Sequence, residues 1–389
     1  MNQLDVLAVV LLIGAAVGGW WSGLVRRLLS WAGLLAGLWV GSQLLPRVVG
    51  SDTHVDLRPR QFLTAAGVLV ACAVIGQLLG GAVGGRLRSW VTRAHLGKPD
   101  QALGALAGVV GVVLLMWIVL PAMASVPGWT ATAARESAVA QLIDDVLGRP
   151  PSAFDGISRS LGLDRLPNVF DDLRPSPGVT SPPPDSTISQ EVLDRALQSV
   201  VKVTGPACGR IQAGSGSVVG DDLVVTNAHV VAGVTDLTVE TTDGREHDAT
   251  VVAFDPRNDL ALLSSPGLDR PALEVRDSVS GDVGVALGFP GGGDLAISPF
   301  RIERQMDAVG RDIYGEQRVD RTILVLAAEL HPGDSGGALL ADDGRLVGVA
   351  FAVAPDQVGT AYGIRVAELR ALLASTTTRE PASVGGCAG

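Results

Sequence analysis

Four long runs of apolar residues dominate the first third of the chain. They cover about residues 4–21, 28–45, 62–84 and 103–124, and almost no charged residue falls inside them. Each run is close to the ~20 residues that a helix needs to cross the ~30 Å hydrocarbon core of a bilayer. Lipid offers the backbone no hydrogen-bond partner, so such a run crosses only as a helix. The pattern predicts a four-helix transmembrane domain over residues 1–125, in preference to four buried helices of a soluble fold.

The polar residues between these runs predict the orientation of the helices. No basic residue precedes the first run, and the run is longer than the apolar core of a signal peptide, so we expect a retained span. Basic residues gather in the first and third loops, and fewer lie in the second: Arg26, Arg27, Arg86, Arg88, Arg93 and Lys98 against Arg47, Arg58 and Arg60. The excess of basic residues marks the cytoplasmic side. Both termini, and everything after residue 125, are then expected on the extracytoplasmic (periplasmic) side of the cytoplasmic membrane.

Glycines recur at four-residue spacing in the runs, which predicts closely packed helices. The pairs and triplets are Gly14/Gly18, Gly33/Gly37/Gly41, Gly81/Gly85 and Gly104/Gly108. No ionisable residue lies in the middle of a run, so the usual mark of an ion or proton path is missing. The pattern therefore favours an anchor over a channel or transporter with a regulatory domain. In topology and glycine pattern, this part resembles the four-span colicin V production family.

Residues 126–185 lose the continuous hydrophobicity and are expected to form a linker. Residues 133–147 fit an amphipathic helix at the membrane surface. The stretch 174–185 contains five prolines and is typical of a semi-rigid, extended spacer. We place the domain boundary near Asp185, where Asp185 or Ser186 is expected to cap a short helix that ends near Gln198.

From Ser199 onward the pattern changes to short strands. Runs rich in Val, Ile and Thr are separated by Gly-Asp and Asp-Gly turns every 8–12 residues. This spacing predicts an all-β barrel or sandwich over residues 186–389. Strands and helices do not alternate, which counts against an α/β hydrolase.

Three short motifs in this half contain residues suited to nucleophilic catalysis. TNAHVV holds His229, DPRNDLALL holds Asp259, and HPGDSGG holds Ser335. A serine hydroxyl needs a base to take its proton, an imidazole suits that task, and a carboxylate on the far ring nitrogen orients the imidazole. The glycines around Ser335 permit a tight turn in which the N–H groups of Gly333 and Ser335 form an oxyanion hole.

In this order and spacing, the three motifs closely resemble the chymotrypsin-fold, trypsin-like serine proteases, and within them the bacterial HtrA/Deg branch. GFPGG at 288–292 and AYGIRV at 361–366 also resemble segments of that branch. The resemblance implies a double β-barrel in which His229 is the general base, Asp259 its orienting carboxylate, Ser335 the nucleophile and Gly333 an oxyanion donor. It also assigns the strand at 348–353 to the wall that pairs with the substrate backbone. The competing interpretation is a catalytically inactive protease fold that serves as a binding module.

Four spans, a proline-rich linker and this protease together resemble the mycobacterial acid-resistance periplasmic proteases, the MarP type found among actinobacteria. That resemblance implies a serine endopeptidase that acts outside the membrane on protein or peptide substrates, including cell-envelope proteins, during acid or oxidative stress. HtrA proteases usually carry a PDZ domain after the protease, whereas only a helix at 367–373 and a short tail follow here. The resemblance implies no cofactor and leaves the oligomeric state undefined.

The cysteines, charges and remaining histidines complete the predictions. On an oxidising side, Cys208 and Cys387 are expected to form a disulfide, while Cys72 is a small packing residue inside the third span. The formal charge is +2 over residues 1–186 and −12 over residues 187–389, which argues against nucleic acid as a partner. No spacing of His and Cys predicts a metal site. Glu329, His331 and Ala352 are expected near the specificity pocket.

Overall fold

The computed structural model describes residues 2–49, 59–93, 97–150, 169–185 and 188–388. Its contacts divide the chain into two compact units. The first comprises residues 1–119 and 137–148, and the second comprises residues 120–136 and 149–389. The first unit is helical, whereas the second contains all of the strands in the described part of the chain.

Four helices of the first part are long and apolar enough to cross a membrane. They are α1 (Gln3–Ser22), α2 (Leu24–Val49), α3 (Pro59–Arg93) and α4 (Gly97–Ser125), and all four exceed the predicted runs at both ends. Helix α1 begins with a capping box, in which Asn2 Oδ1 accepts a hydrogen bond from Asp5 N and Asp5 Oδ2 accepts one from Asn2 N.

Glycines bring helices together at only some of the predicted positions. A Cβ added to Gly33 of α2 would lie 2.1 Å from the carbonyl oxygen of Gly76 on α3. A Cβ on Gly19 of α1 would lie 2.1 Å from the carbonyl oxygen of Gly104 on α4. In contrast, Gly14 and Gly18 have open space around them, so the prediction was wrong for this pair. Sequence spacing cannot say which face of a helix meets its neighbour.

Two short helices follow α4, where we expected one. Helix α5 (Trp129–Arg135) and helix α6 (Ala138–Leu147) are separated at Ser137. The Ser137 hydroxyl accepts from Ala140 N as the N-cap of α6, and it donates to Asp5 Oδ1 at 2.6 Å. Extended backbone at Ser137 is the usual conformation of an N-cap. The continuous helix predicted over 133–147 is therefore wrong.

The C-terminal half begins with α8 (Gln190–Ala196) and the 3₁₀ turn η2 (Leu197–Ser199). Ser189 caps α8 by accepting from Val192 N. The cap is therefore Ser189 and not Asp185, so the prediction of Asp185 was wrong. The other predicted cap, Ser186, lies outside the described residues.

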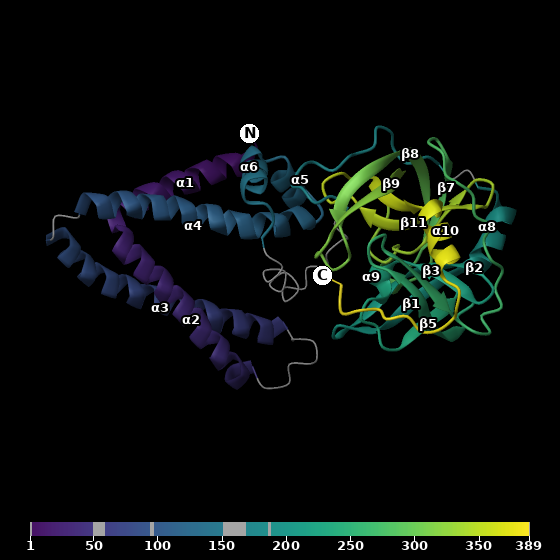
Figure 1. Cartoon of the computed structure of the whole chain (residues 1–389), viewed down its shortest axis with the longest axis horizontal. Helices are drawn as coiled ribbons and strands as arrows, with labels where there is room; N and C mark the ends of the chain where they lie inside the picture. The colour runs from purple at the N-terminus through teal and green to yellow at the C-terminus, as the bar shows by residue number, and fades with distance from the viewer. Residues whose placement is uncertain (1, 50–58, 94–96, 151–168, 186–187, 389) are drawn as a thin grey trace. The chain divides into compact units, whose positions relative to one another are not determined.

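Twelve strands then form two closed antiparallel barrels, which Figure 1 shows one above the other. The first barrel has the order β1 (Val200–Ala207), β2 (Arg210–Gly220), β3 (Leu223–Thr226), β6 (Leu260–Ser264), β5 (Glu246–Asp255) and β4 (Leu237–Thr241). The second has the order β10 (Ala338–Ala341), β11 (Leu346–Val353), β12 (Thr360–Arg365), β9 (Arg318–Ala328), β8 (Ala296–Arg311) and β7 (Val283–Gly288). The predicted double barrel is confirmed.

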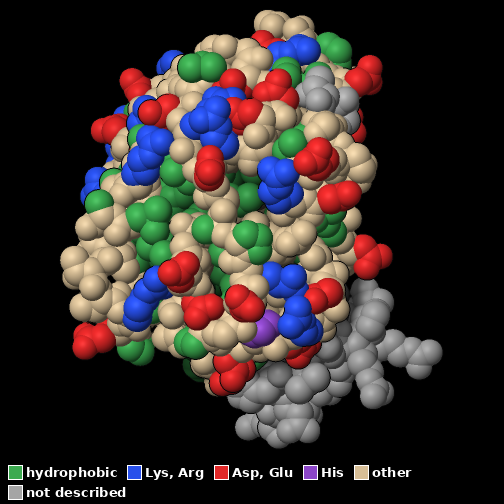
Figure 2. Space-filling view, turned by 90° about the vertical axis from the view of Figure 1, so that its right-hand side faces the viewer, with side chains coloured by type: hydrophobic (Ala, Val, Ile, Leu, Met, Phe, Trp, Pro, Cys, Tyr) green, Lys and Arg blue, Asp and Glu red, His purple; other side chains and the backbone are tan. Residues whose placement is uncertain are grey.

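The remaining elements of this half lie at the loops and at the end of the chain. They are the one-turn helix α9 (Ala228–Val231), the 3₁₀ turn η3 (Pro290–Gly292) and the C-terminal helix α10 (Val366–Ser375). A cluster of buried apolar side chains joins the barrels, with Leu262 of the first barrel and Leu287, Val325 and Phe351 of the second among its members. On the face in Figure 2, acidic and basic side chains are interspersed around this half.

Candidate active site

His229 and Asp259 are held together by two hydrogen bonds. His229 lies in α9, directly after β3, and Asp259 directly precedes β6, the neighbour of β3 in the first barrel. Asp259 Oδ2 lies 2.6 Å from His229 Nδ1, and Asp259 Oδ1 accepts from His229 N at 2.8 Å. Asp259 is fully buried, whereas 20% of the His229 side chain is exposed. One carboxylate therefore fixes both the ring and the backbone of His229, and the rest of the ring faces outward.

The backbone at Asp259 is itself unusual. Its φ of 57° lies in the left-handed region, which aspartate tolerates better than most residues do. The buried Asn227 stabilises this conformation, because its Nδ2 donates to the carbonyl oxygen of Asp259 at 2.8 Å. Asn227 stands in the TNAHVV motif, but the motif was interpreted for His229 alone, and the role of Asn227 was missed because its partner lies 32 residues away.

The residues before Ser335 form a tight turn. Asp334 N donates to the carbonyl oxygen of His331 at 3.0 Å, and Gly333 has a φ of 102°. These are the hydrogen bond and the positive φ of a type II turn, with Pro332 at its second position. A Cβ on Gly333 would lie 2.4 Å from Gly291 N. Glycine is thus required here both by the conformation and by the close approach of η3.

Within the described residues, the N–H groups of Gly333 and Ser335 donate to no protein atom. The N–H groups of Asp334, Gly336 and Gly337, by contrast, are all hydrogen-bonded. Gly333 and Ser335 are half-buried, and most buried backbone donors in proteins are paired. Two unpaired donors on either side of one residue therefore suit an acceptor supplied from outside the chain.

Ser215 of β2 connects the first barrel to this turn. Its hydroxyl donates to the carbonyl oxygen of Gly333 at 2.7 Å and accepts from Phe289 N at 2.8 Å. Its backbone N–H donates to the carbonyl oxygen of Ser335 at 2.8 Å. The residue is fully buried. Sequence reasoning missed Ser215, because nothing near it in the chain indicates a partner 118 residues away.

The neighbouring Gly214 lies between the two halves of the candidate triad. A Cβ on Gly214 would lie 2.6 Å from Val230 of α9 and 3.2 Å from the carbonyl oxygen of Ser335. The structure thus brings the helix that holds His229 and the turn that holds Ser335 to opposite sides of one residue of β2. No hydrogen bond joins Ser335 Oγ to His229 Nε2 among the residues that the structure describes.

Asp334, for which no partner was evident from the sequence, accepts a hydrogen bond at Oδ2 from His331 N at 2.8 Å. Its Oδ1 is buried and has no hydrogen-bond partner in the described part of the chain. Burial raises the pKa of this carboxyl above its usual range, and the hydrogen bond from His331 partly opposes that effect. Asp334 Oδ2 is therefore the acceptor for a backbone N–H at the start of the turn, while burial disfavours the charged form of the carboxyl.

Strand β11 forms the wall beside the turn. Gly336 N donates to the carbonyl oxygen of Ala350 at 2.9 Å, and Ala350 N donates to that of Gly337 at 2.8 Å. Of the three residues expected near the specificity pocket, Ala352 is buried in this strand, while Glu329 and His331 are exposed.

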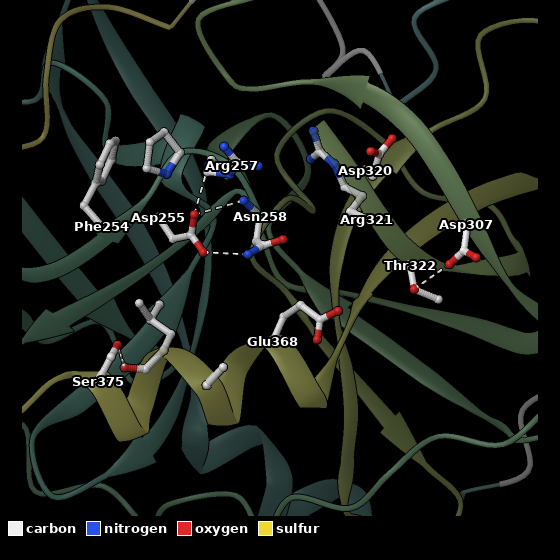
Figure 3. Close-up of a pocket in the computed structure, with 13 residues that line it drawn as sticks. Phe254, Asp255, Arg257, Asn258, Asp307, Asp320, Arg321, Thr322, Glu368 and Ser375 are labelled. Atoms are coloured by element: carbon white, nitrogen blue, oxygen red, sulfur yellow. Dashed lines mark hydrogen bonds between the residues drawn. The ribbon is translucent and has the colours of Figure 1, made fainter. Parts of the chain in front are cut away.

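A pocket lies beside the turn that precedes Asp259 in the chain (Figure 3), and neither His229 nor Ser335 lines it. The turn 255–258 and helix α10 face each other across it. Arg321 of β9 is buried there, 5.4 Å from the ring centroid of Phe351. Burial lowers the pKa of Arg321, and the negative charges of Asp259, Asp255 and Asp312 oppose that shift. Sequence reasoning also missed Arg321. Its positive charge acts on Asp259 from strand β9, which lies far from Asp259 along the chain.

Cys208 and Cys387 form a disulfide with a Cα–Cα separation of 5.9 Å. Two hydrogen bonds also hold the C-terminal tail that this disulfide secures. Ala382 N donates to the carbonyl oxygen of Val251, and Tyr314 Oη donates to the carbonyl oxygen of Val384. Cys72 is free. Among the described residues, no group of three or more His, Cys, Asp or Glu side chains is arranged to hold a metal ion.

Two family models match the chain. Residues 4–148 match the colicin V production protein family, and residues 214–349 match the trypsin-like peptidase domain. The second match spans His229, Asp259 and Ser335.

Individual relatives extend the likeness to the whole chain. The serine protease Rv3671c of Mycobacterium tuberculosis is 31% identical over 398 residues, which cover 99% of this chain and 98% of that protein. The periplasmic serine endoprotease DegP of Escherichia coli is 36% identical over 39% of this chain and 33% of its own length. A crystal structure of the Rv3671c protease in its active form covers 55% of this chain and 96% of that structure, with 35% identity and a TM-score of 0.52. The chain therefore belongs to the Rv3671c (MarP) family of serine proteases with N-terminal membrane helices, and its catalytic half is a trypsin-like serine endopeptidase.

Proposed function

We propose that this membrane protein cleaves peptide bonds with Ser335 as nucleophile, His229 as general base and Asp259 as the carboxylate that orients the base. One observation carries the proposal. The Asp259 carboxylate holds the ring and the backbone of His229, and β2 connects that residue to a turn with two unpaired N–H donors. Acyl transfer by a serine requires a buried carboxylate that orients an imidazole, and an imidazole that takes the proton of the serine hydroxyl.

The proposed reaction has two stages. Ser335 Oγ attacks the substrate carbonyl carbon while His229 Nε2 takes the hydroxyl proton, and Asp259 stabilises the imidazolium through Nδ1–H. The N–H groups of Gly333 and Ser335 donate to the oxyanion. His229 then gives the proton to the leaving amine, which leaves an ester on Ser335. Water, activated by the same imidazole, hydrolyses the ester, releases the acid product and restores Ser335.

A latent or inactive protease fold is the second candidate. The observation in its favour is that Ser335 Oγ and His229 Nε2 are not hydrogen-bonded in the described structure. The paired His229 and the free donors support catalysis more strongly, because catalytic hydrogen bonds often tighten only when substrate binds.

We assign residues 1–125 to an anchor, 126–185 to a connecting segment and 186–389 to the protease. The basic residues of the first and third loops support an extracytoplasmic protease, and so does the disulfide, since disulfides persist in oxidising compartments. Likeness to the MarP family extends the proposal to cell-envelope proteins as substrates and to survival under acid or oxidative stress.

A fluorophosphonate probe tests the central proposal. The full chain in lipid nanodiscs is labelled beside its Ser335→Ala and His229→Ala variants, and Ser278→Ala serves as a control that changes a serine between the barrels. We expect labelling of the parent and of the control, and none of the other two variants. Absence of labelling in the parent between pH 5 and 8, with and without reductant, would contradict the proposal and favour the latent or inactive protease fold.

A further inference from the structure

The second unit includes the last turn of a transmembrane helix as well as the protease. Helix α4 ends at Ser125, and α5 follows it within the same unit. Gly128 N donates to the carbonyl oxygen of Pro355 at 2.9 Å, and Thr132 Oγ1 lies 3.5 Å from the carbonyl oxygen of Asp356. Both acceptors belong to the turn between β11 and β12, residues 354–359. This turn is therefore attached to the point where the chain leaves the span.

A buried ion pair strengthens that attachment. Arg135 and Asp356 are both buried, with 3.8 Å between Arg135 Nε and Asp356 Oδ1. Arg135 Nε also donates to the carbonyl oxygen of Ala124 in α4, at 3.3 Å. Ser176 N donates to Asp356 Oδ2 at 2.9 Å. One arginine thus connects the end of α4 to the β11–β12 turn, and the carboxylate of the turn is neutralised rather than presented to solvent.

Two large apolar side chains project from this junction into solvent. Trp129, the first residue of α5, is 78% exposed, and Val358, in the turn, is 97% exposed. Trp129 lies only four residues beyond the end of α4. At that distance from a span, the bilayer interface is close, and tryptophan is enriched in that layer.

We propose that Trp129 and Val358 form a contact patch that inserts into the interfacial layer of the bilayer around α4. The occupant of the patch is lipid, because the patch is continuous with the end of a membrane-spanning helix. The Arg135–Asp356 pair makes the contact rigid, so the protease rests on the membrane by its β11–β12 turn. Strand β11, which carries the candidate substrate wall, then ends close to the bilayer surface.

Lipid quenching tests this contact in the full chain. Val358→Cys is made in a Cys72→Ala background, where Cys208 and Cys387 are bonded to each other, and is labelled with an environment-sensitive fluorophore. The protein is reconstituted into phosphatidylcholine/phosphatidylglycerol vesicles that contain lipid spin-labelled near the headgroup. Val279→Cys, at a site 59% exposed between β6 and β7, is the matched control.

We expect severalfold stronger lipid quenching at position 358 than at position 279, and weaker quenching at 358 by aqueous iodide. Equal quenching at the two positions would overturn the proposal. Trp129→Cys completes the series. Quenching at 129 without quenching at 358 would also overturn it, because the turn would then lie away from the bilayer. Both positions are exposed, so the substitutions leave the fold intact.

Discussion

Ser215 shows how far the candidate oxyanion site depends on a residue outside the nucleophile motif. Ser215→Ala removes the donor to the Gly333 carbonyl oxygen and leaves Phe289 N unpaired. Removal of a group that holds catalytic donors in place costs on the order of 10–100-fold in rate. We expect kcat to fall by about that factor, with KM little changed. Steady-state cleavage of a peptide by the full chain measures both constants.

Ser217 offers a matched control for that experiment. It lies two residues further along β2 and is equally buried, but its hydroxyl has no hydrogen-bond partner in the described structure. Ser217→Ala is therefore expected to retain the parental kcat. Equal losses in the two variants would mean that Ser215 contributes to packing alone.

Asp334 makes a distinct prediction for pH. Its pKa is raised in the folded protein by burial, so between the unfolded and folded pKa values the native state binds more protons than the unfolded state. In that window, stability falls as pH rises, and ionised Asp334 is destabilising at neutral pH. Asn keeps an acceptor for His331 N without the charge. We expect Asp334→Asn to raise the thermal inactivation midpoint at pH 7.5, by an amount that shrinks as the pH is lowered. If the midpoints of the variant and the parent differed by the same amount at every pH, the charge of buried Asp334 would not be the cause.

The residues that sequence could and could not identify differ in one respect. His229, Asp259 and Ser335 stand in short motifs whose composition itself indicates chemistry. Ser215, Asn227 and Arg321 act through partners that only the closed barrels bring near. Ser215 and Arg321 stand in ordinary strand sequence, and Asn227 stands in the His229 motif without any local sign of its partner. Short-range pattern therefore predicted the groups that we propose for catalysis and left out the residues that hold them in place.

At the level of elements, the sequence predicted the strands and the membrane spans correctly, but it did not predict the segments that connect them correctly. Runs rich in Val, Ile and Thr between turn signals predicted the strands of a barrel or sandwich, and the resemblance to trypsin-like proteases predicted the double barrel. The Ser137 hydroxyl makes the local N-cap bond to Ala140 N and also a bond to Asp5 at the start of the chain, and local sequence does not reveal the second. The same holds for α5, whose contact with the β11–β12 turn joins residues over 200 positions apart.

The Arg135–Asp356 pair allows that contact to be tested. Arg135→Leu leaves a buried carboxylate without its cation, a change that typically costs about 3–5 kcal/mol. We expect faster amide hydrogen exchange in residues 128–135 and 354–360. The exposed pair Arg195–Glu191 is the control, since Arg195→Leu is expected to leave exchange in both segments unchanged. The second change Asp356→Leu should restore part of the protection, and its failure to do so would contradict the ion-pair explanation.

For the whole molecule, the disulfide joins residues 179 positions apart. In the chain-entropy model, a loop of this size contributes up to about 5 kcal/mol. We expect Cys208→Ser with Cys387→Ser to lower the midpoint of thermal inactivation and to detach the tail, which becomes sensitive to added protease. Cys72→Ser, which breaks no bridge, serves as the control. An unchanged midpoint in the double variant would show that the hydrogen bonds of Ala382 and Val384 suffice to hold the tail.

Orientation is a property of the whole chain, because one arrangement of basic residues decides the side of every later segment. Arg88, near the end of α3, donates to Asp100 and to the carbonyl oxygen of Trp21, so basic charge lies at the ends of three spans on one side. Positive charge is retained on the cytoplasmic face. A membrane-impermeant maleimide should therefore reach Val279→Cys in right-side-out vesicles and Ser89→Cys only in inverted ones, both in the Cys72→Ala background. The reverse pattern would place the protease in the reducing cytoplasm, where the Cys208–Cys387 bridge would not persist.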